Sequence, residues 1–207
     1  MIIKVCGMRQ PENIRKIETL GIDWMGFIFF ARSPRNVETL PDYMPSRQKR
    51  VGVFVNPTAE FVIEKVRDFG LDLVQLHGKE TPEFCQKVKQ TARVQVIKAF
   101  SIASADDLSA TELYDGACDY LLFDTKCESV GGSGQRFNWA VLDRYKGKTP
   151  FLLSGGIGLE NVDDVLQFSH PQLAGLDLNS KFETAPAIKD FDRLSSFITE
   201  IRKTKTI

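Results

Sequence analysis

The sequence predicts a parallel α/β protein whose strands close into a (β/α)₈ barrel. Eight short runs rich in β-branched and aromatic residues occur at 2–6, 24–30, 50–55, 73–76, 94–100, 120–123, 151–153 and 173–178. The runs start roughly every 20–30 residues with no Pro/Gly/Ser-rich linker between them, as expected for repeated βα units. An open doubly wound sheet, which usually has five or six strands, is the weaker alternative. We expect one barrel domain over residues 1–207.

Segments with helical periodicity lie between the predicted strands. Apolar residues fall on one helical face in 12–20, 59–69, 82–88 and 104–113, and a last helix is expected at 191–202. Good N-cap residues precede or begin several of these helices, namely Thr58, Thr81, Ser104 and Asn138. The alternation of strand and helix therefore extends along the whole chain.

Composition excludes several function classes. Lys plus Arg and Asp plus Glu number 27 each, so bulk charge gives no reason to expect nucleic acid or acidic lipid as a partner. No apolar run approaches the ~20 residues that span a bilayer, and Lys4 comes too early for a signal peptide. Four irregularly spaced Cys and two His predict no metal site. We expect a cytoplasmic protein with free thiols, no metal, and action as a monomer.

Polar residues recur where the predicted strands end. Because side chains alternate along a strand, one set should face the barrel interior near its C-terminal mouth. The polar members of that set are expected to be Lys4, Cys6, Gln75, His77, Lys98, Asp124, Asp177 and Asn179. The alternative is that the charged residues form interior ion pairs and that Cys6 is a small buried hydrophobe. A shared rim of polar residues, each followed by a small residue, favours a site. We also expect Lys4 and Asp177 to pair and to favour the thiolate of Cys6.

The ends of the last two strands predict a phosphate site. Ser154-Gly155-Gly156 follows the seventh strand, and Asn179-Ser180-Lys181 follows the eighth. Loops at these two positions, with the N-terminus of a short extra helix, form the usual phosphate site of such barrels. A glycine cluster at 131–134 is either a flexible connector or a lid over a sugar phosphate, and its position favours the lid.

Seven motifs in order resemble the phosphoribosylanthranilate isomerase family of tryptophan biosynthesis. They are Lys4-Val5-Cys6-Gly7, Ser33-Pro34-Arg35, Val51-Gly52-Val53-Phe54-Val55-Asn56, Gln75-Leu76-His77-Gly78, Phe123-Asp124-Thr125, the glycines of 131–134 with Phe137 and Trp139, and Leu153-Ser154-Gly155-Gly156. The resemblance extends over nearly the whole chain, from Lys4 to about Asp190.

The resemblance implies an Amadori rearrangement of N-(5′-phosphoribosyl)anthranilate, without cofactor or metal. It implies that Asp124 is the general acid, that Cys6 is the general base, and that Arg35 holds the anthranilate carboxylate. The other substrate-binding residues that it implies are Gly155, Gly156, Asp177, Asn179 and Ser180, with the glycines and the strand-eight loop around the phosphate. A Lys stands at position 181 where the family usually has Gly, and we expect its ammonium to point at the phosphate.

The same residues argue against three other functions. The analogous histidine-pathway isomerase uses two Asp as its acid–base pair, so Cys6 argues against it. A metal-dependent ribulose-phosphate epimerase needs more His than the two present. A non-catalytic phosphate-binding barrel would have no need of both Cys6 and Asp124.

Overall fold

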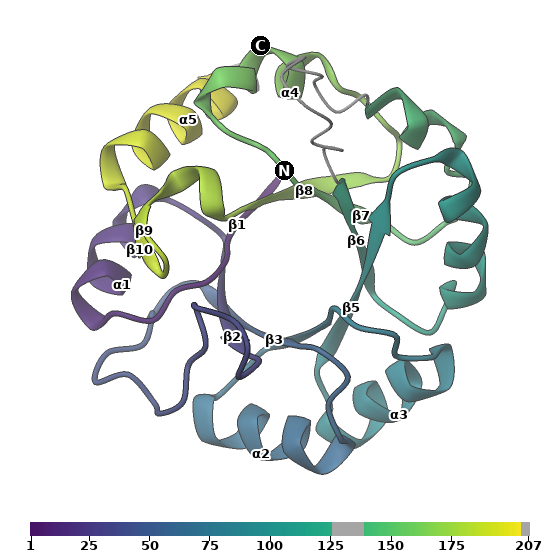
Figure 1. Ribbon diagram of the computed structural model, residues 1–207, viewed down its shortest axis with the longest axis horizontal. Coiled ribbons are helices and arrows are strands. Elements are labelled where there is room, and N and C mark those ends of the chain that lie inside the picture. The colour runs from purple at the N-terminus through teal and green to yellow at the C-terminus, as the bar shows by residue number, and fades with distance from the viewer. Residues whose placement is uncertain (126–138, 204–207) are drawn as a thin grey trace.

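A computed structural model of the chain describes residues 1–125 and 139–203. Eight parallel strands form a closed barrel in the order of the sequence, and the helices form a ring around it (Figure 1). The strands are β1 (Ile2–Val5), β2 (Trp24–Phe29), β3 (Lys49–Phe54), β4 (Leu73–Leu76), β5 (Gln95–Ile102), β6 (Tyr120–Thr125), β7 (Phe151–Ser154) and β8 (Leu173–Leu178). The expectation of eight parallel strands is confirmed, with shifts of one or two residues at several ends.

The outer layer mixes α-helices with 3₁₀-helices. The α-helices are α1 (Pro11–Ile17), α2 (Ala59–Phe69), α3 (Pro82–Ala92), α4 (Val162–Gln167) and α5 (Phe191–Lys203). The 3₁₀-helices are η1 (Glu18–Leu20), η2 (Ala105–Tyr114), η3 (Trp139–Arg144), η4 (Leu159–Asn161) and η5 (Ser180–Phe182). Thr58 and Thr81 cap α2 and α3 as predicted, each accepting a hydrogen bond from a backbone N–H. Asn138 and residues 131–134 lie outside the described residues.

The segment between β2 and β3 has no helix. Residues 30–48 form turns and irregular chain, visible in Figure 1 as the loop between the α1 and α2 positions. Pro34, Pro41 and Pro45 explain this, because each lacks an N–H and disfavours helical geometry in the residue before it. Val37, Tyr43 and Met44 from this segment pack against the core in place of a helix.

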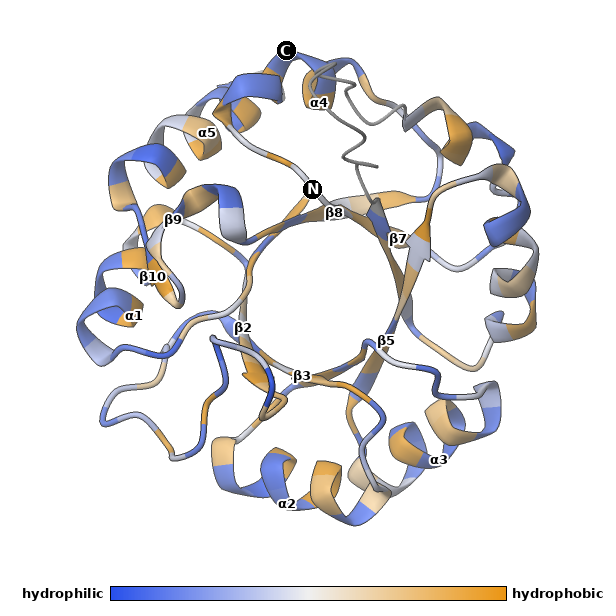
Figure 2. Ribbon diagram, in the orientation of Figure 1, coloured by the Kyte–Doolittle hydropathy of each residue, from blue (hydrophilic) through white to orange (hydrophobic). Residues whose placement is uncertain are grey.

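Two apolar layers hold the barrel together. The inner layer fills the barrel with Trp24, Val51, Leu73, Ile97, Ala99, Leu122 and Leu152. The outer layer lies between the strands and the helices, and the helices accordingly carry both hydrophobic and hydrophilic stretches (Figure 2).

The prediction that Lys98 lines the mouth is wrong. Ile97 and Ala99 occupy the inner layer, so Lys98 points outward, under the loop after β4. There its Nζ donates to the carbonyl of Gly78 at 2.8 Å and lies 3.3 Å from Glu80 Oε2. Both faces of β5 are largely apolar, so the sequence pattern does not define which of its two sets of alternating side chains faces the barrel interior.

A small hairpin follows β8 and was not predicted. Its strands β9 (Glu183–Ala185) and β10 (Ile188–Lys189) pair antiparallel. Ala187 takes a positive φ of 67° in the turn. The hairpin lies beside α1, outside the mouth of the barrel (Figure 1).

Candidate active site

A polar pocket opens at the C-terminal ends of the strands. Its lining residues are Cys6, Ile28, Val53, Gln75, His77, Asp124, Ser154, Gly155, Gly156, Ile157, Asp177, Asn179, Ser180 and Lys181. All the predicted site residues except Arg35 therefore meet in one pocket. Of the predicted inward-facing polar set, Lys4 is not among the lining residues, because it lies buried below the floor.

A buried ion pair supports the floor of the pocket. Lys4 and Asp177 are register partners on β1 and β8, and Lys4 Nζ lies 2.7 Å from Asp177 Oδ1. Ser154 Oγ from β7 donates to the other oxygen of Asp177 at 3.4 Å. Burial alone lowers the pKa of Lys4, but the Asp177 carboxylate offsets this, and the net shift is upward. The predicted pair is confirmed, and Lys4 is held as a cation.

Cys6 lies on top of this pair. Its backbone N–H donates to the carbonyl of Leu178 at 2.9 Å, which fixes the end of β1 against β8. Gly26 on β2 leaves room for the thiol, since a Cβ at that position would lie 2.8 Å from Cys6 Sγ. The sequence therefore places a glycine where the neighbouring strand passes closest to the thiol.

The electrostatics of Cys6 differ from the prediction. Burial raises the pKa of the Cys6 thiol, Lys4 and Lys189 lower it, and Asp177 raises it. The net shift is upward, because desolvation of the thiolate is the largest effect. Lys4 does favour the thiolate, as expected, but it does not overcome burial.

Asp124 at the end of β6 faces a histidine. Its Oδ2 lies 3.6 Å from His77 Nε2, and both side chains are about one-third exposed to the pocket. Gln75 Nε2 lies 2.9 Å from His77 Nδ1, within hydrogen-bonding distance, and the other ring nitrogen of His77 faces Asp124. A row of three side chains thus leads from the barrel interior to the carboxyl group.

The loops after β7 and β8 bound the pocket on the far side. Gly155 and Gly156 have φ values of 88° and 67°, a region that glycine enters without strain. Lys181 lines the pocket, and its Nζ pairs with Glu160 Oε1 at 2.9 Å. The expected contact of Lys181 with a phosphate stays a prediction.

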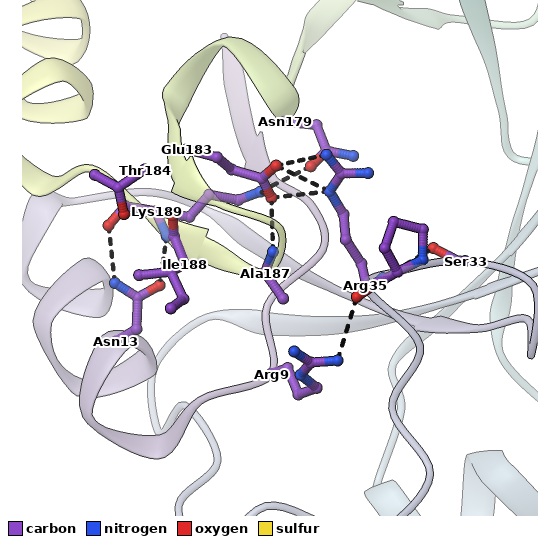
Figure 3. Close-up of polar contacts among 11 residues, drawn as sticks. Arg9, Asn13, Ser33, Arg35, Asn179, Glu183, Thr184, Ala187, Ile188 and Lys189 are labelled. Carbon is purple, nitrogen blue, oxygen red and sulfur yellow. Dashed lines mark hydrogen bonds and ion pairs between the residues drawn. The ribbon is translucent and has the colours of Figure 1, made fainter.

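Arg35 lies at the edge of this pocket and is held by a carboxylate that we had not assigned to the site. Its Nε donates to Glu183 at 2.9 and 3.0 Å, and its Nη2 donates at 2.5 Å (Figure 3). Gly7 explains the close packing, since a Cβ there would lie 2.8 Å from Arg35 Cδ and 2.9 Å from Asn179 Oδ1. Arg35 therefore lies beside Asn179 and next in space to the residue that follows Cys6.

These features define a (β/α)₈-barrel enzyme with one polar site at the C-terminal mouth, which combines a thiol, a carboxyl group and a glycine-lined loop. The family model described as N-(5′-phosphoribosyl)anthranilate (PRA) isomerase matches residues 3–200. The chain belongs to this family, whose enzymes isomerise that sugar phosphate in tryptophan biosynthesis.

Relatives and solved structures agree. The N-(5′-phosphoribosyl)anthranilate isomerase of Phocaeicola vulgatus is 56% identical to this chain, and the alignment covers 98% of both chains. The isomerase of Parabacteroides distasonis is 52% identical, and the alignment covers 97% of this chain and 93% of that relative. The crystal structure of phosphoribosyl anthranilate isomerase from Thermotoga maritima has a TM-score of 0.81 at 31% identity, covering 98% of this chain and 100% of that one. Another structure of the isomerase, in complex with reduced 1-(o-carboxyphenylamino)-1-deoxyribulose 5-phosphate, has a TM-score of 0.79 at 29% identity with the same coverage. Among the residues described here, no helix is long and apolar enough to cross a membrane.

Proposed function

We propose that Asp124 and Cys6 are the general acid and the general base of the isomerisation. The observation that carries this proposal is that both side chains line one pocket, Asp124 from β6 and Cys6 from directly after β1, within a site that also contains the glycine loop after β7. A protonated carboxyl group can donate a proton, and a cysteine in its thiolate form can accept one.

The steps follow from these two groups. Asp124 protonates the ring oxygen of the ribose, which opens the ring to a Schiff base. Cys6 removes the proton from C2′ and gives an enolamine. The enolamine then tautomerises to the ketone, so the reaction is an internal redox rearrangement that needs no external electron acceptor. His77 Nε2 lies 3.6 Å from Asp124 Oδ2, so the imidazole faces the carboxylate that forms on Asp124.

The rest of the site holds the two anionic ends of the substrate. Arg35 binds the anthranilate carboxylate, because a guanidinium matches a carboxylate in two parallel hydrogen bonds. Gly155, Gly156, Asn179 and Ser180 surround the phosphate, with backbone N–H groups as donors. Asp177 contributes from below by holding Lys4.

The cellular setting is part of the same proposal. We propose that the protein acts as a monomer and forms a single domain over residues 1–207, in which one closed barrel carries the pocket. The described cysteines Cys6, Cys85 and Cys118 are all free, which supports a reducing cytoplasm. Sedimentation of the purified protein at several concentrations tests the monomer, and a dimer at micromolar concentration would contradict it.

The acid–base assignment is tested with Cys6→Ser and Asp124→Asn. Each removes the proton-transfer function while keeping a polar group of similar size, so each should lower kcat roughly 10²–10⁴-fold. KM should change little, because the phosphate and carboxylate contacts remain. Turnover of N-(5′-phosphoribosyl)anthranilate is followed by the loss of anthranilate-type fluorescence. Near-full turnover by folded Cys6→Ser would show that Cys6 is not the base.

A further inference from the structure

Two buried charges of the β9–β10 hairpin connect Arg35 to the surroundings of Cys6. Lys189 Nζ donates to Glu183 Oε1 at 2.5 Å and to Asn179 Oδ1 at 2.7 Å, and its side chain is fully buried. Glu183, also buried, accepts from Arg35 on its other side (Figure 3). Burying two such charges is costly, so this arrangement exceeds what a surface hairpin needs for its own stability.

The hairpin is fixed from both sides. Asn13 on α1 binds the backbone of Lys189 twice, donating to its carbonyl at 2.9 Å and accepting from its N–H at 2.8 Å. The N–H of Ala187 in the turn donates to Glu183 Oε1 at 3.1 Å. Arg9 donates to the carbonyls of Pro34 and Asn36, on either side of Arg35. Both ends of the Arg35–Glu183 contact are thereby held in place.

The geometry leaves one edge of Arg35 for a ligand. Glu183 engages Nε and Nη2 of the guanidinium, so the edge formed by Nη1 and the second N–H of Nη2 is not used by Glu183. The three groups Arg35, Glu183 and Lys189 together carry one net positive charge. Burial raises the pKa of Glu183, but the hydrogen bonds from Arg35 and Lys189 lower it by more. The net shift of the pKa is downward, so the carboxylate stays ionised. One positive charge is therefore left for a second carboxylate.

Lys189 also reaches toward Cys6. A Cβ on Gly7 would lie 3.4 Å from Lys189 Nζ, so the ammonium packs against the residue that follows Cys6. The charged groups that act on Cys6 are Lys4 on β1, Asp177 on β8, Lys189 on the hairpin and Arg35 from the β2–β3 segment.

We propose that Glu183 and Lys189 are positioning residues of the isomerase. Glu183 holds Arg35 with one edge presented to the ring carboxylate of the substrate. Lys189 holds Glu183 and places a second cation near Cys6. This inference rests on the proposed roles of Arg35 and Cys6, and it adds that the hairpin sets both.

Binding of a substrate-like ligand, measured without catalysis, tests whether Glu183 positions Arg35. The probes are reduced 1-(o-carboxyphenylamino)-1-deoxyribulose 5-phosphate and the same compound without the ring carboxyl group, with Kd measured by calorimetry. Glu183→Gln should weaken the first probe about tenfold and leave the second unchanged, and it should add nothing to Arg35→Ala in the double variant. Glu64→Gln, at an exposed carboxylate on α2, is the matched control and should bind both probes normally.

The outcomes separate the two proposals. If Arg35→Ala weakens both probes equally, the assignment of Arg35 fails, and the positioning role of Glu183 fails with it. If Arg35→Ala affects only the carboxylate probe while Glu183→Gln affects both, or has an additive effect in the double variant, only the positioning role is overturned.

The pH profile of kcat/KM tests whether Lys189 acts on Cys6. Lys189→Met removes a charge that lowers the pKa of Cys6, so the acid limb of the profile should move to higher pH. In Lys189→Arg, which keeps the positive charge, the acid limb should lie closer to that of the wild type than it does in Lys189→Met. A folded Lys189→Met protein with an unmoved limb would overturn the role of Lys189 at Cys6. Thermal unfolding verifies that each variant is folded, and the Glu183→Gln experiment decides whether Glu183 positions Arg35 even if Lys189→Met does not fold.

Discussion

At Cys6, opposing charges and burial leave the thiol protonated near neutral pH. Two lysines stabilise the thiolate, but desolvation of a buried sulfur outweighs them, and the pKa is raised above its ordinary value of 9.0. The base is active only when deprotonated, so kcat/KM should rise with pH from neutrality to about pH 9. A pH–rate profile measures this. A rate that is flat or that falls over the same interval would contradict the assignment of Cys6 as the base in its resting environment.

Arg35 should act on binding more than on turnover. It holds a carboxylate that is present in the substrate and in the transition state alike, so its loss removes uniform binding. We expect Arg35→Ala to raise KM at least tenfold with a smaller fall in kcat. Steady-state kinetics on N-(5′-phosphoribosyl)anthranilate distinguish the two constants. A variant with unchanged KM and abolished kcat would place Arg35 in the chemical step instead.

At the scale of elements, the buried Lys4–Asp177 pair joins the first strand to the last. Removing one partner leaves an uncompensated buried charge, which typically costs ~3–5 kcal/mol. We therefore expect Lys4→Met to lower the free energy of unfolding by about that amount, as measured in urea. The double variant Lys4→Met/Asp177→Leu should be less destabilised than the single one, because neither charge remains. If the double variant loses as much free energy of unfolding as Lys4→Met, or more, the pair itself stabilises the barrel.

The elements also show which features the sequence can predict. Strand β4 and helix α2 were predicted to the residue, because a short apolar run and a strong helical period each mark a clear boundary. The predicted orientation of β5 was wrong. Both faces of this strand are largely apolar, so only the closed barrel determines which side chains point inward. The β9–β10 hairpin was missed, because its strands are only three and two residues long and carry no periodic pattern.

The same limit applies to the site. Cys6, Asp124 and the two glycines after β7 could be predicted because each lies at the C-terminal end of a strand or directly after it, where topology dictates a common rim. Glu183 and Lys189 follow no barrel strand, and their role depends on a contact with Arg35 across 148 residues of sequence. Such a contact carries no local signal in a single sequence.

At the scale of the whole molecule, the site draws its residues from β2, β3, β4, β6, β7 and β8 and from the segments that follow β1, β4, β7 and β8. A ligand that bridges these strands binds only the closed barrel, since unfolding separates every one of its contacts. Binding at this site is therefore linked to the stability of the entire fold rather than to one loop.

This linkage predicts a measurable rise in Tm. Reduced 1-(o-carboxyphenylamino)-1-deoxyribulose 5-phosphate at 100 times its Kd should add ~2.7 kcal/mol to the free energy of unfolding. For a chain of this length that corresponds to an increase of about 5–11 °C. Cys6→Ser should keep the increase, because the phosphate and carboxylate contacts do not need the thiol, whereas Arg35→Ala should lose part of it. Differential scanning calorimetry with and without the ligand measures each shift. An unchanged Tm in the wild-type protein at saturating ligand would mean that the pocket at the barrel mouth does not bind this compound, and the site assigned here would be wrong.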